Sequence, residues 1–168
     1  YNHKFLRKNL RTQTGQKNII QSGLNRFSRF EKEMNYLFKI TSSKKDWIAL
    51  PFLESSFNPI AVSKVNAVGA WQIMPFIAKK LLPYGNGVDG RYNLLLSTIA
   101  ASIILKQNMR ITKSSEISII AYNSGLRNFF KTRKKLNKQV ITYDEYIENS
   151  SSKSFGFASK NFLMEYFA

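Results

Sequence analysis

Apolar residues recur every three or four positions along most of this chain. Between residues 19 and 40 this spacing places Ile20, Leu24 and Phe27 on one face, which predicts a single amphipathic helix. The apolar run 94–105 is too short, and too often interrupted by Ser and Thr, to span a bilayer, so it predicts a buried core helix. We predict helices at 70–82, 94–110, 114–123, 126–137, 143–149 and 156–167. Because no strand-like alternation of apolar and polar residues appears, the predicted fold class is all-α.

Polar and conformationally restricted residues mark the breaks between these helices. Thr41-Ser-Ser predicts the start of a helix that runs to about Ser56, and Pro51 is expected to kink it. An irregular loop follows, with room for a small hairpin at 60–70. The segment Pro83-Tyr-Gly-Asn-Gly predicts a turn between two later helices.

The length and composition are typical of one globular domain. The chain has 168 residues, of which 43% are hydrophobic and 14% aromatic, and this is enough to bury a core. It contains no cysteine and a single histidine, His3, which excludes disulfides, a cysteine nucleophile and histidine-based metal or triad chemistry. We therefore expect no metal and no other cofactor.

The net charge of +16 is concentrated on the two flanks of the chain. Residues 1–45 carry eleven Lys and Arg against two acids, 46–125 carry seven against four, and 126–168 carry eight against four. The C-terminal flank includes Arg127, Lys131, Arg133, Lys134, Lys135 and Lys138. This balance predicts a polyanionic partner, and nucleic acid, anionic lipid and peptidoglycan with its acidic polymers would all attract it. Charge alone favours nucleic acid.

Glu54 is the strongest candidate for a catalytic residue. It is a lone acid at the end of the apolar run Trp47-Ile-Ala-Leu-Pro-Phe-Leu, where loss of hydration is expected to raise the pKa of its carboxyl toward neutrality. A carboxylic acid that is still protonated near neutral pH can donate a proton to a leaving oxygen. The alternative interpretation is a partly exposed Glu at the end of a helix.

Three sequence blocks in a fixed order resemble a known enzyme family. The blocks are Glu54-Ser-x-Phe-x-Pro-x-Ala-x-Ser-x3-Ala-x-Gly-x-Trp-Gln-x-Met-Pro75, then Val88-Asp-x-Arg-x-Asn93 with Thr98-x-Ala-Ala after it, and finally Ala121-Tyr-Asn-x-Gly125. Together they resemble the lysozyme-like lytic transglycosylases with an SLT domain, which form glycoside hydrolase family 23. The approach Asp46-Trp-Ile-Ala-Leu-Pro-Phe-Leu53 is similar to the membrane-bound murein transglycosylase D subgroup.

The resemblance implies a lysozyme-like fold with an N-terminal helical extension, and cleavage of the MurNAc-β-1,4-GlcNAc bond of peptidoglycan with formation of 1,6-anhydro-MurNAc ends. Glycosidases usually need two carboxylates. In the motif region Asp89 is the only plausible partner for Glu54, and pairing with Arg91 or capping of the next helix is the favoured role for Asp89. A single Glu suffices when the acetamido oxygen of the substrate attacks the anomeric carbon. The resemblance implies that the C6 hydroxyl of the sugar then completes the reaction, with Glu54 as the base.

The resemblance also assigns substrate-binding roles around the acid. The residues concerned are Ser63, Gln72, Met74, Tyr122 and Asn123. Ser63 and Asn123 would hold the acetamido group, with turn and cap formation as the alternative. Gln72 would contact sugar groups through its amide, and Tyr122 would lie beside the acid. Met74 would line the groove, with core packing as the alternative.

Four further positions carry structural expectations. Trp71 is expected in the core rather than as a sugar platform, and Ser55 is expected to support the backbone after the acid. Gly69 is expected where a side chain would obstruct the chain. The last helix of the subgroup usually carries a Tyr that reaches the groove, and Phe162 stands at the corresponding place here.

Two rival functions remain open. A relative of goose-type lysozyme would cleave the same bond with water, and a non-catalytic basic module would bind cell wall or nucleic acid without turnover. We expect a basic helical extension at 1–45 packed on a catalytic domain at 46–168, together forming one compact monomer without a transmembrane segment. The expected partners are peptidoglycan glycan strands and the anionic wall surface, not nucleic acid. The chain begins at Tyr1 without a signal segment, and we expect an exported protein of the periplasm or cell envelope.

Overall fold

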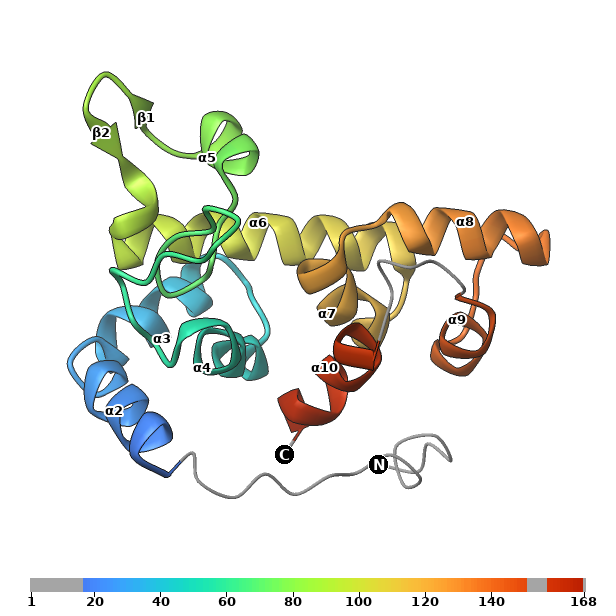
Figure 1. The fold of residues 1–168 in the computed structure, drawn as a ribbon, viewed down its shortest axis with the longest axis horizontal. Coiled ribbons are helices and arrows are strands. Elements are labelled where there is room, and N and C mark those ends of the chain that lie inside the picture. Colours follow the sequence, from blue (N-terminus) through green and yellow to red (C-terminus); the bar gives the residue numbers. More distant parts are fainter. Residues whose placement is uncertain (1–16, 151–156, 168) are drawn as a thin grey trace. The chain divides into compact units, whose positions relative to one another are not determined.

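The computed structural model describes residues 17–150 and 157–167, and these residues form an all-α fold, as the sequence predicts (Figure 1). They fall into two compact units, 17–103 and the described residues from 104 onward, and the boundary lies within helix α6. The first unit contains α2 (Lys17–Phe27), α3 (Glu31–Ile40), the 3₁₀ helix η1 (Lys45–Ala49), α4 (Leu50–Ser55), α5 (Pro75–Leu81), β1 (Tyr84–Gly85), β2 (Val88–Asp89), the 3₁₀ helix η2 (Gly90–Tyr92) and the start of α6 (Leu94–Thr112). The second unit contains the end of α6, then α7 (Ser115–Ser124), α8 (Arg127–Leu136), α9 (Tyr143–Asn149) and α10 (Phe157–Phe167).

The predicted single helix over 19–40 is wrong, because α2 and α3 are separate helices. The chain turns at 28–30, where the backbone N–H of Phe30 donates to the carbonyl of Phe27 at 2.8 Å. No glycine or proline stands at this break. Packing explains it, since Phe27 contacts α4 while the apolar residues of α3, among them Met34 and Phe38, are buried in the core. The spacing of apolar residues by three and four positions predicted the helical conformation of residues 19–40. It could not predict that the two halves of this segment pack against different neighbours.

Trp71 lies in the core of the first unit, as expected. Its side chain is fully buried, and its indole N–H donates to the hydroxyl of Thr98 on α6 at 2.8 Å. The ring of Phe38 meets it edge-on with centroids 6.4 Å apart. A buried indole normally requires such a polar partner. The bond therefore ties the segment that precedes α5 to α6.

The irregular loop before α5 contains the small hairpin that the sequence allowed for. Val68 forms antiparallel bridges with both Val62 and Ile73. Gly69 follows with a φ of +82°, and a Cβ atom at this position would lie 2.2 Å from the carbonyl oxygen of Arg91. This approach is far below van der Waals contact, so only glycine fits. The expectation for Gly69 is confirmed. The predicted helix 70–82 is correspondingly shorter and begins at Pro75.

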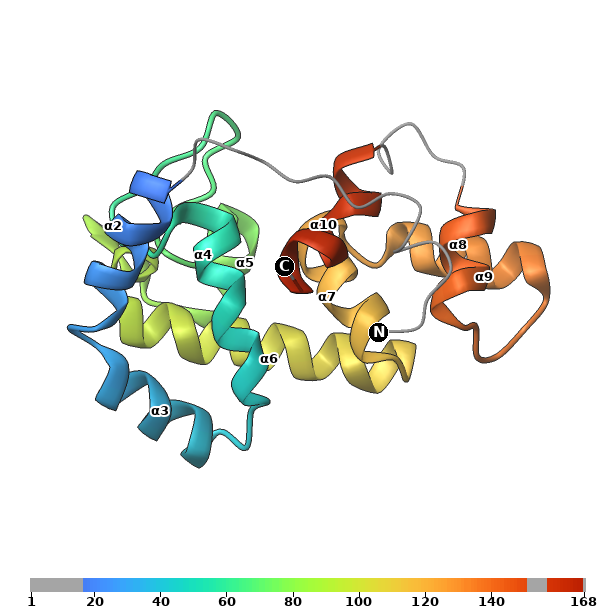
Figure 2. The ribbon, with the colours of Figure 1, turned by 90° about the horizontal axis from the view of Figure 1, so that it is seen from below.

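The second unit is built around α7, which packs against α10 in both ribbon views (Figures 1 and 2) and also contacts α8 and α9. Helix α9 begins with a capping box, in which Thr142 and Glu145 satisfy each other's backbone N–H groups. Burial raises the pKa of Tyr146 on α9 to about 12, with hydrogen bonds to Ser124 and Ser150 acting in the opposite direction. Among the described residues, no helix is both long enough and apolar enough to cross a membrane, and this includes the longest, α6.

We predict that Gly69→Ala destabilises the protein by about 2–4 kcal/mol, because strain at positive φ adds to the clash with the carbonyl of Arg91. Gly87→Ala is the matched control, since Gly87 has a φ of +80° and a Cβ there would meet nothing within 4 Å. Urea denaturation of both variants separates the two contributions. Equal losses of stability would show that the close approach contributes nothing.

We also predict that Tyr146 makes folding sensitive to alkaline pH. An unfolded tyrosine has a pKa of about 10, and the folded value is about 12. A raised pKa contributes stability that is complete below pH 10 and is lost as pH rises through 12, on the order of 2 kcal/mol. Tyr146→Phe should therefore lose less unfolding free energy than the wild type between pH 9 and 11.5. Tyr36→Phe, at a side chain that is 63% exposed, should behave like the wild type.

Candidate active site

Glu54 lies in the last turn of α4 and is half-buried. The sequence predicted one helix with a kink at Pro51, but the structure has a 3₁₀ turn followed by α4. Pro51 stands in the first turn of α4, where a backbone N–H has no partner within the helix and proline is tolerated. Proline therefore begins the helix that carries the acid instead of bending it.

A left-handed turn ends α4 two residues after Glu54. Ser56 has a φ of +51° and Phe57 a φ of +60°. Their N–H groups donate to the carbonyls of Phe52 and Pro51 at 3.0 and 2.9 Å, which closes the helix end. Glycine is the usual residue in this conformation, and each residue with a Cβ costs roughly 1–2 kcal/mol there. Two such residues in sequence require support from their surroundings.

Ser55 supplies one part of that support. Its hydroxyl donates to the carbonyl of Ala70 at 2.9 Å and accepts from the N–H of Asn58 at 3.0 Å. The first bond ties the end of α4 to the turn that contains Gly69. The expected supporting role of Ser55 is confirmed.

Aromatic rings supply the second part. Phe57 is buried, and its ring centroid lies 4.8 Å from that of Phe52 on α4 and 5.2 Å from that of Phe27 on α2. Arg26, the neighbour of Phe27, donates to the carbonyl of Ser56 at 2.9 Å. Sequence analysis missed Arg26, because nothing local links it to a carbonyl thirty residues away.

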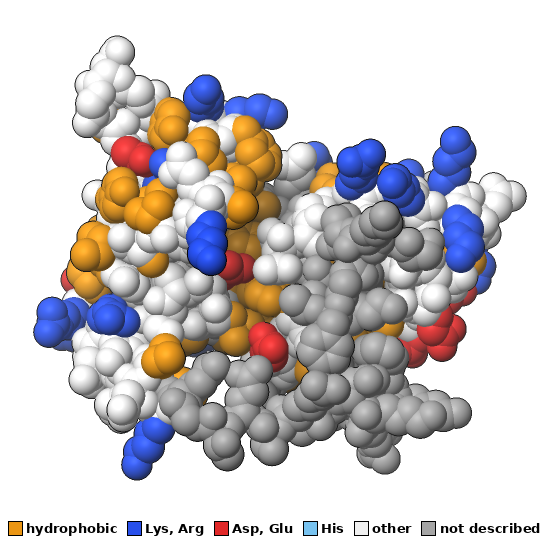
Figure 3. Space-filling view, viewed as in Figure 1, with side chains coloured by type: hydrophobic (Ala, Val, Ile, Leu, Met, Phe, Trp, Pro, Cys, Tyr) orange, Lys and Arg blue, Asp and Glu red, His pale blue; other side chains and the backbone are white. Residues whose placement is uncertain are grey.

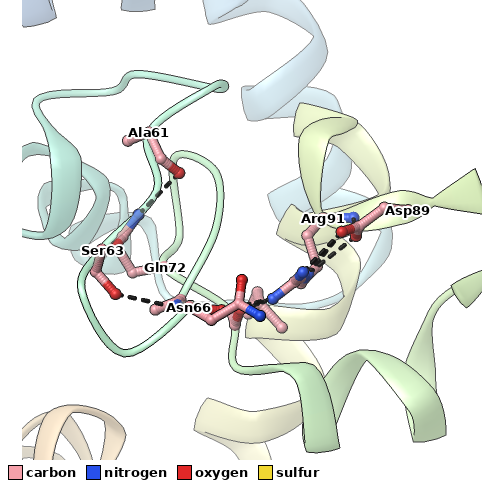
Figure 4. A network of polar contacts seen from close by, with 8 residues as sticks. Ala61, Ser63, Asn66, Gln72, Asp89 and Arg91 are labelled. Atoms are coloured by element: carbon pink, nitrogen blue, oxygen red, sulfur yellow. Dashed lines mark hydrogen bonds and ion pairs between the residues drawn. The ribbon is translucent and has the colours of Figure 1, made fainter.

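Ser63 and Gln72 lie on the loop that follows this turn, where backbone groups hold both side chains (Figure 4). The hydroxyl of Ser63 accepts from the N–H of Ala67 at 2.9 Å and keeps its own proton for donation. The side-chain amide of Gln72 donates to the carbonyls of Gly69 and Ala61 at 2.9 and 3.4 Å. Because both partners are acceptors, the NH₂ end of the Gln72 amide must face them. The carbonyl oxygen of Gln72 is thereby left for an external donor.

Asp89 is engaged with Arg91, as the sequence predicts (Figure 4). The guanidinium donates to both carboxylate oxygens at 2.7–3.1 Å, and the backbone N–H of Arg91 adds a bond at 3.1 Å. These hydrogen bonds hold the pKa of the Asp89 carboxyl below its usual range and raise the pKa of Arg91. The same guanidinium donates to the carbonyls of Asn66 and Ile73, so this ion pair fastens the loop.

The remaining predicted residues lie at other places in the fold. Met74 is half-buried and directly precedes α5. Tyr122 and Asn123 belong to the second unit, in the last turn of α7, where Tyr122 is half-buried and Asn123 exposed. Phe162 on α10 is buried. Among the residues that the structure describes, no three His, Cys, Asp or Glu side chains gather in a way that could hold a metal ion.

Comparisons with known proteins identify the family of this chain. A chain segment of 101 residues is 35% identical to the membrane-bound lytic murein transglycosylase D of Escherichia coli (strain K12), and equally to that of Escherichia coli O6:H1 (strain CFT073). The match covers 55% of this chain and 22% of each relative, so the chain spans about a fifth of their length. The family model of the transglycosylase SLT domain matches residues 37–144. This chain therefore belongs to the transglycosylase SLT domain family, with its lysozyme-like all-α fold.

Proposed function

We propose that this protein is a peptidoglycan lytic transglycosylase that cleaves the MurNAc-β-1,4-GlcNAc bond with Glu54 as its only catalytic carboxylate. The observation that carries the proposal is the ion pair between Asp89 and Arg91. A carboxylate held anionic by a buried guanidinium is a poor acid or base, and Asp89 was the only plausible second acid. A mechanism that needs one carboxylate therefore fits this site better than one that needs two.

In the proposed reaction Glu54 first donates its proton to the glycosidic oxygen. As that C–O bond breaks, the acetamido oxygen of MurNAc forms a bond to the anomeric carbon. The C6 hydroxyl of the same sugar then attacks that carbon and expels the acetamido oxygen, and its proton returns to Glu54. The products are a 1,6-anhydro end and a free hydroxyl, with no water consumed and the acid regenerated.

The side chains on the loop suit the substrate groups that this reaction must hold. The hydroxyl of Ser63 retains a proton that can be donated to the acetamido carbonyl. The amide oxygen of Gln72 can accept from a sugar hydroxyl or N–H, since its amine is bound to backbone carbonyls. From the family resemblance we further assign Asn123 to the acetamido group, Tyr122 to the acid and Met74 to the groove wall.

The proposed location is the periplasm or cell envelope. It rests on the membrane-bound murein transglycosylases that match this chain. The proposed partner is the glycan strand of peptidoglycan, together with the anionic surface of the wall.

We predict that Glu54→Gln abolishes release of muropeptides from purified sacculi, while thermal stability stays level or rises, because a catalytic carboxyl is often placed at a cost to stability. The wild-type products should carry 1,6-anhydro-MurNAc ends, which mass spectrometry distinguishes from reducing ends by the mass of one water. Asp46→Asn, at an exposed acid shortly before α4, is the control and should release normal products.

Each rival function has its own outcome in this experiment. Predominantly reducing ends would assign the protein to the hydrolases of the goose-type lysozyme class. Undiminished release by Glu54→Gln would remove Glu54 from the chemistry, and a wild type that binds sacculi without releasing products would be a binding module. If Asp89→Asn lost turnover while the amides of the loop at 61–73 kept wild-type protection from hydrogen exchange, a two-carboxylate mechanism would be supported.

Helix α8 is the basic surface that we assign to wall binding. Figure 3 shows Lys and Arg side chains gathered over it. Arg127, Lys131 and Lys134 are exposed. Other basic residues nearby are engaged, because Arg133 lies over the rings of Phe129 and Phe130, Lys135 donates to the carbonyl of Asn149, and Lys138 pairs with Glu145. Arg127, Lys131 and Lys134 can therefore meet a polyanion without giving up a ring contact, hydrogen bond or ion pair of this kind.

We predict that replacing Arg127, Lys131 and Lys134 by Gln weakens binding to sacculi and flattens its dependence on salt. Attraction between exposed charges is screened beyond about 8 Å at physiological ionic strength, so wild-type binding should itself fall steeply as salt rises. Turnover of a short soluble glycan should change little. The matched control replaces Lys79, Lys80 and Arg110, three exposed cations outside the flanks, and should leave binding close to wild type. Equal effects of the two triple variants would show that total charge, not α8, controls binding.

A further inference from the structure

Helix α2 lies against the end of the helix that carries Glu54, and Figure 2 shows the two side by side, as does Figure 1. Gly23 is the buried residue of α2. A Cβ atom there would lie 3.1 Å from the carbonyl oxygen of Ser56 and 3.1 Å from a ring carbon of Phe52. The absence of a side chain thus lets the backbone of α2 approach the left-handed turn closely.

Arg26 uses this approach to reach the turn itself. Its guanidinium donates to the carbonyl of Ser56 at 2.9 Å, in a partly buried setting. A cation at the C-terminal end of a helix satisfies a carbonyl that has no partner within the helix and opposes the negative end of the helix dipole. Hydrogen bonds from a charged donor are stronger than those between neutral groups. Arg26 therefore stabilises Ser56 in a conformation that serine adopts only under constraint.

Phe27 acts on the second strained residue. Its ring packs against Phe57 at 5.2 Å and against Phe52 at 5.9 Å, so the three rings hold Phe57 in place. Arg26 and Phe27 follow Gly23 by three and four positions, so all three residues lie on the face of α2 that meets α4. We call these three residues the α2 contact.

We propose that the α2 contact positions the catalytic carboxyl, with Arg26 as a positioning residue for Glu54; the proposal rests on the proposed function of Glu54. Helix α4 has six residues, so its last turn depends on how its end is held. Without Arg26, Ser56 and Phe57 are free to leave the left-handed region, and the turn that carries Glu54 loosens. The loop with Ser63 and Gln72 has a second anchor in Arg91, whose bonds to loop carbonyls do not involve α4.

This division predicts which kinetic constant changes. A displacement of about 1 Å at a catalytic group can lower the rate about a hundredfold. Loosening of α4 should therefore lower kcat, whereas KM should stay close to its wild-type value because none of the proposed substrate-binding residues belongs to α4. Loss of global stability alone would also lower apparent kcat at unchanged KM, because it reduces the active fraction. The folded fraction of each variant is therefore measured by urea denaturation, and kcat is expressed per folded molecule.

The test compares Arg26→Ala with Arg26→Lys and with the control Arg29→Ala, all in the full chain. Arg29 is exposed, three residues away, and carries the same charge. With a short soluble peptidoglycan glycan as substrate, Arg26→Ala should lower kcat about tenfold or more, with KM within about twofold of wild type. Arg26→Lys should recover part of kcat, because its ammonium can still donate to the carbonyl of Ser56. Arg29→Ala should match the wild type. Unchanged kcat in Arg26→Ala, or a parallel loss in Arg29→Ala, would overturn the proposal.

A second measurement separates this proposal from the proposed function. The amides of Ser56 and Phe57 donate to carbonyls of α4, so their hydrogen exchange reports directly on the helix end. In Arg26→Ala these two amides should exchange their hydrogens faster than in the wild type. The amide of Ile119, in the core of the second unit, should keep its wild-type protection. If the wild type released no anhydro products, the proposed function would fail, and exchange would still decide whether α2 holds α4. Unchanged exchange at Ser56 and Phe57 would overturn the positioning role.

Discussion

The left-handed turn at Ser56 and Phe57 is the constraint on which the arrangement around Glu54 depends. It ends α4 and sends the chain back toward the loop that carries Ser63. Glycine would adopt this turn without strain, but it could not supply the buried ring of Phe57 that packs with Phe27 and Phe52. The fold thus accepts an unfavourable backbone conformation at one residue to gain an aromatic contact from its side chain. Strain of this kind, next to a catalytic group, survives only where neighbouring contacts determine it.

A second constraint fixes the structural role of Asp89. The guanidinium of Arg91 is almost completely buried, and a buried cation requires a partner, which Asp89 supplies. The same guanidinium donates to two loop carbonyls. The backbone carbonyl oxygen of Arg91 leaves no room for a side chain at Gly69. Removing Asp89 from this network would therefore disturb the loop as well as the charge. Asp89 therefore serves the fold by holding the guanidinium that fastens the loop.

Sequence alone predicted the regular parts of this fold and the short-range contacts of the site. The helices from 94 onward were found to within a few residues, and two of them, α7 and α9, begin at the side-chain caps Ser114 and Thr142. The pairing of Asp89 with Arg91 was predictable because only one residue separates them. The break between α2 and α3 was not, and neither was the bond from Arg26 to Ser56, because both depend on contacts between distant segments. Positive φ at Ser56 and Phe57 also lacked a signal, since neither residue type favours that conformation.

The extent of the family match shows which of the contacts that hold the end of α4 lie inside the family's boundary and which lie outside it. The SLT model begins at residue 37, whereas α2 ends at Phe27, so the helix that contacts α4 lies outside the matched region. Within residues 37–144 the end of α4 keeps Ser55 and the ring of Phe52, but it has neither Arg26 nor Phe27. The matched segment therefore contains the acid and the loop without all of the contacts that hold the strained turn between them. In this chain α2 packs with the segment that carries Glu54, even though its sequence lies before the matched region.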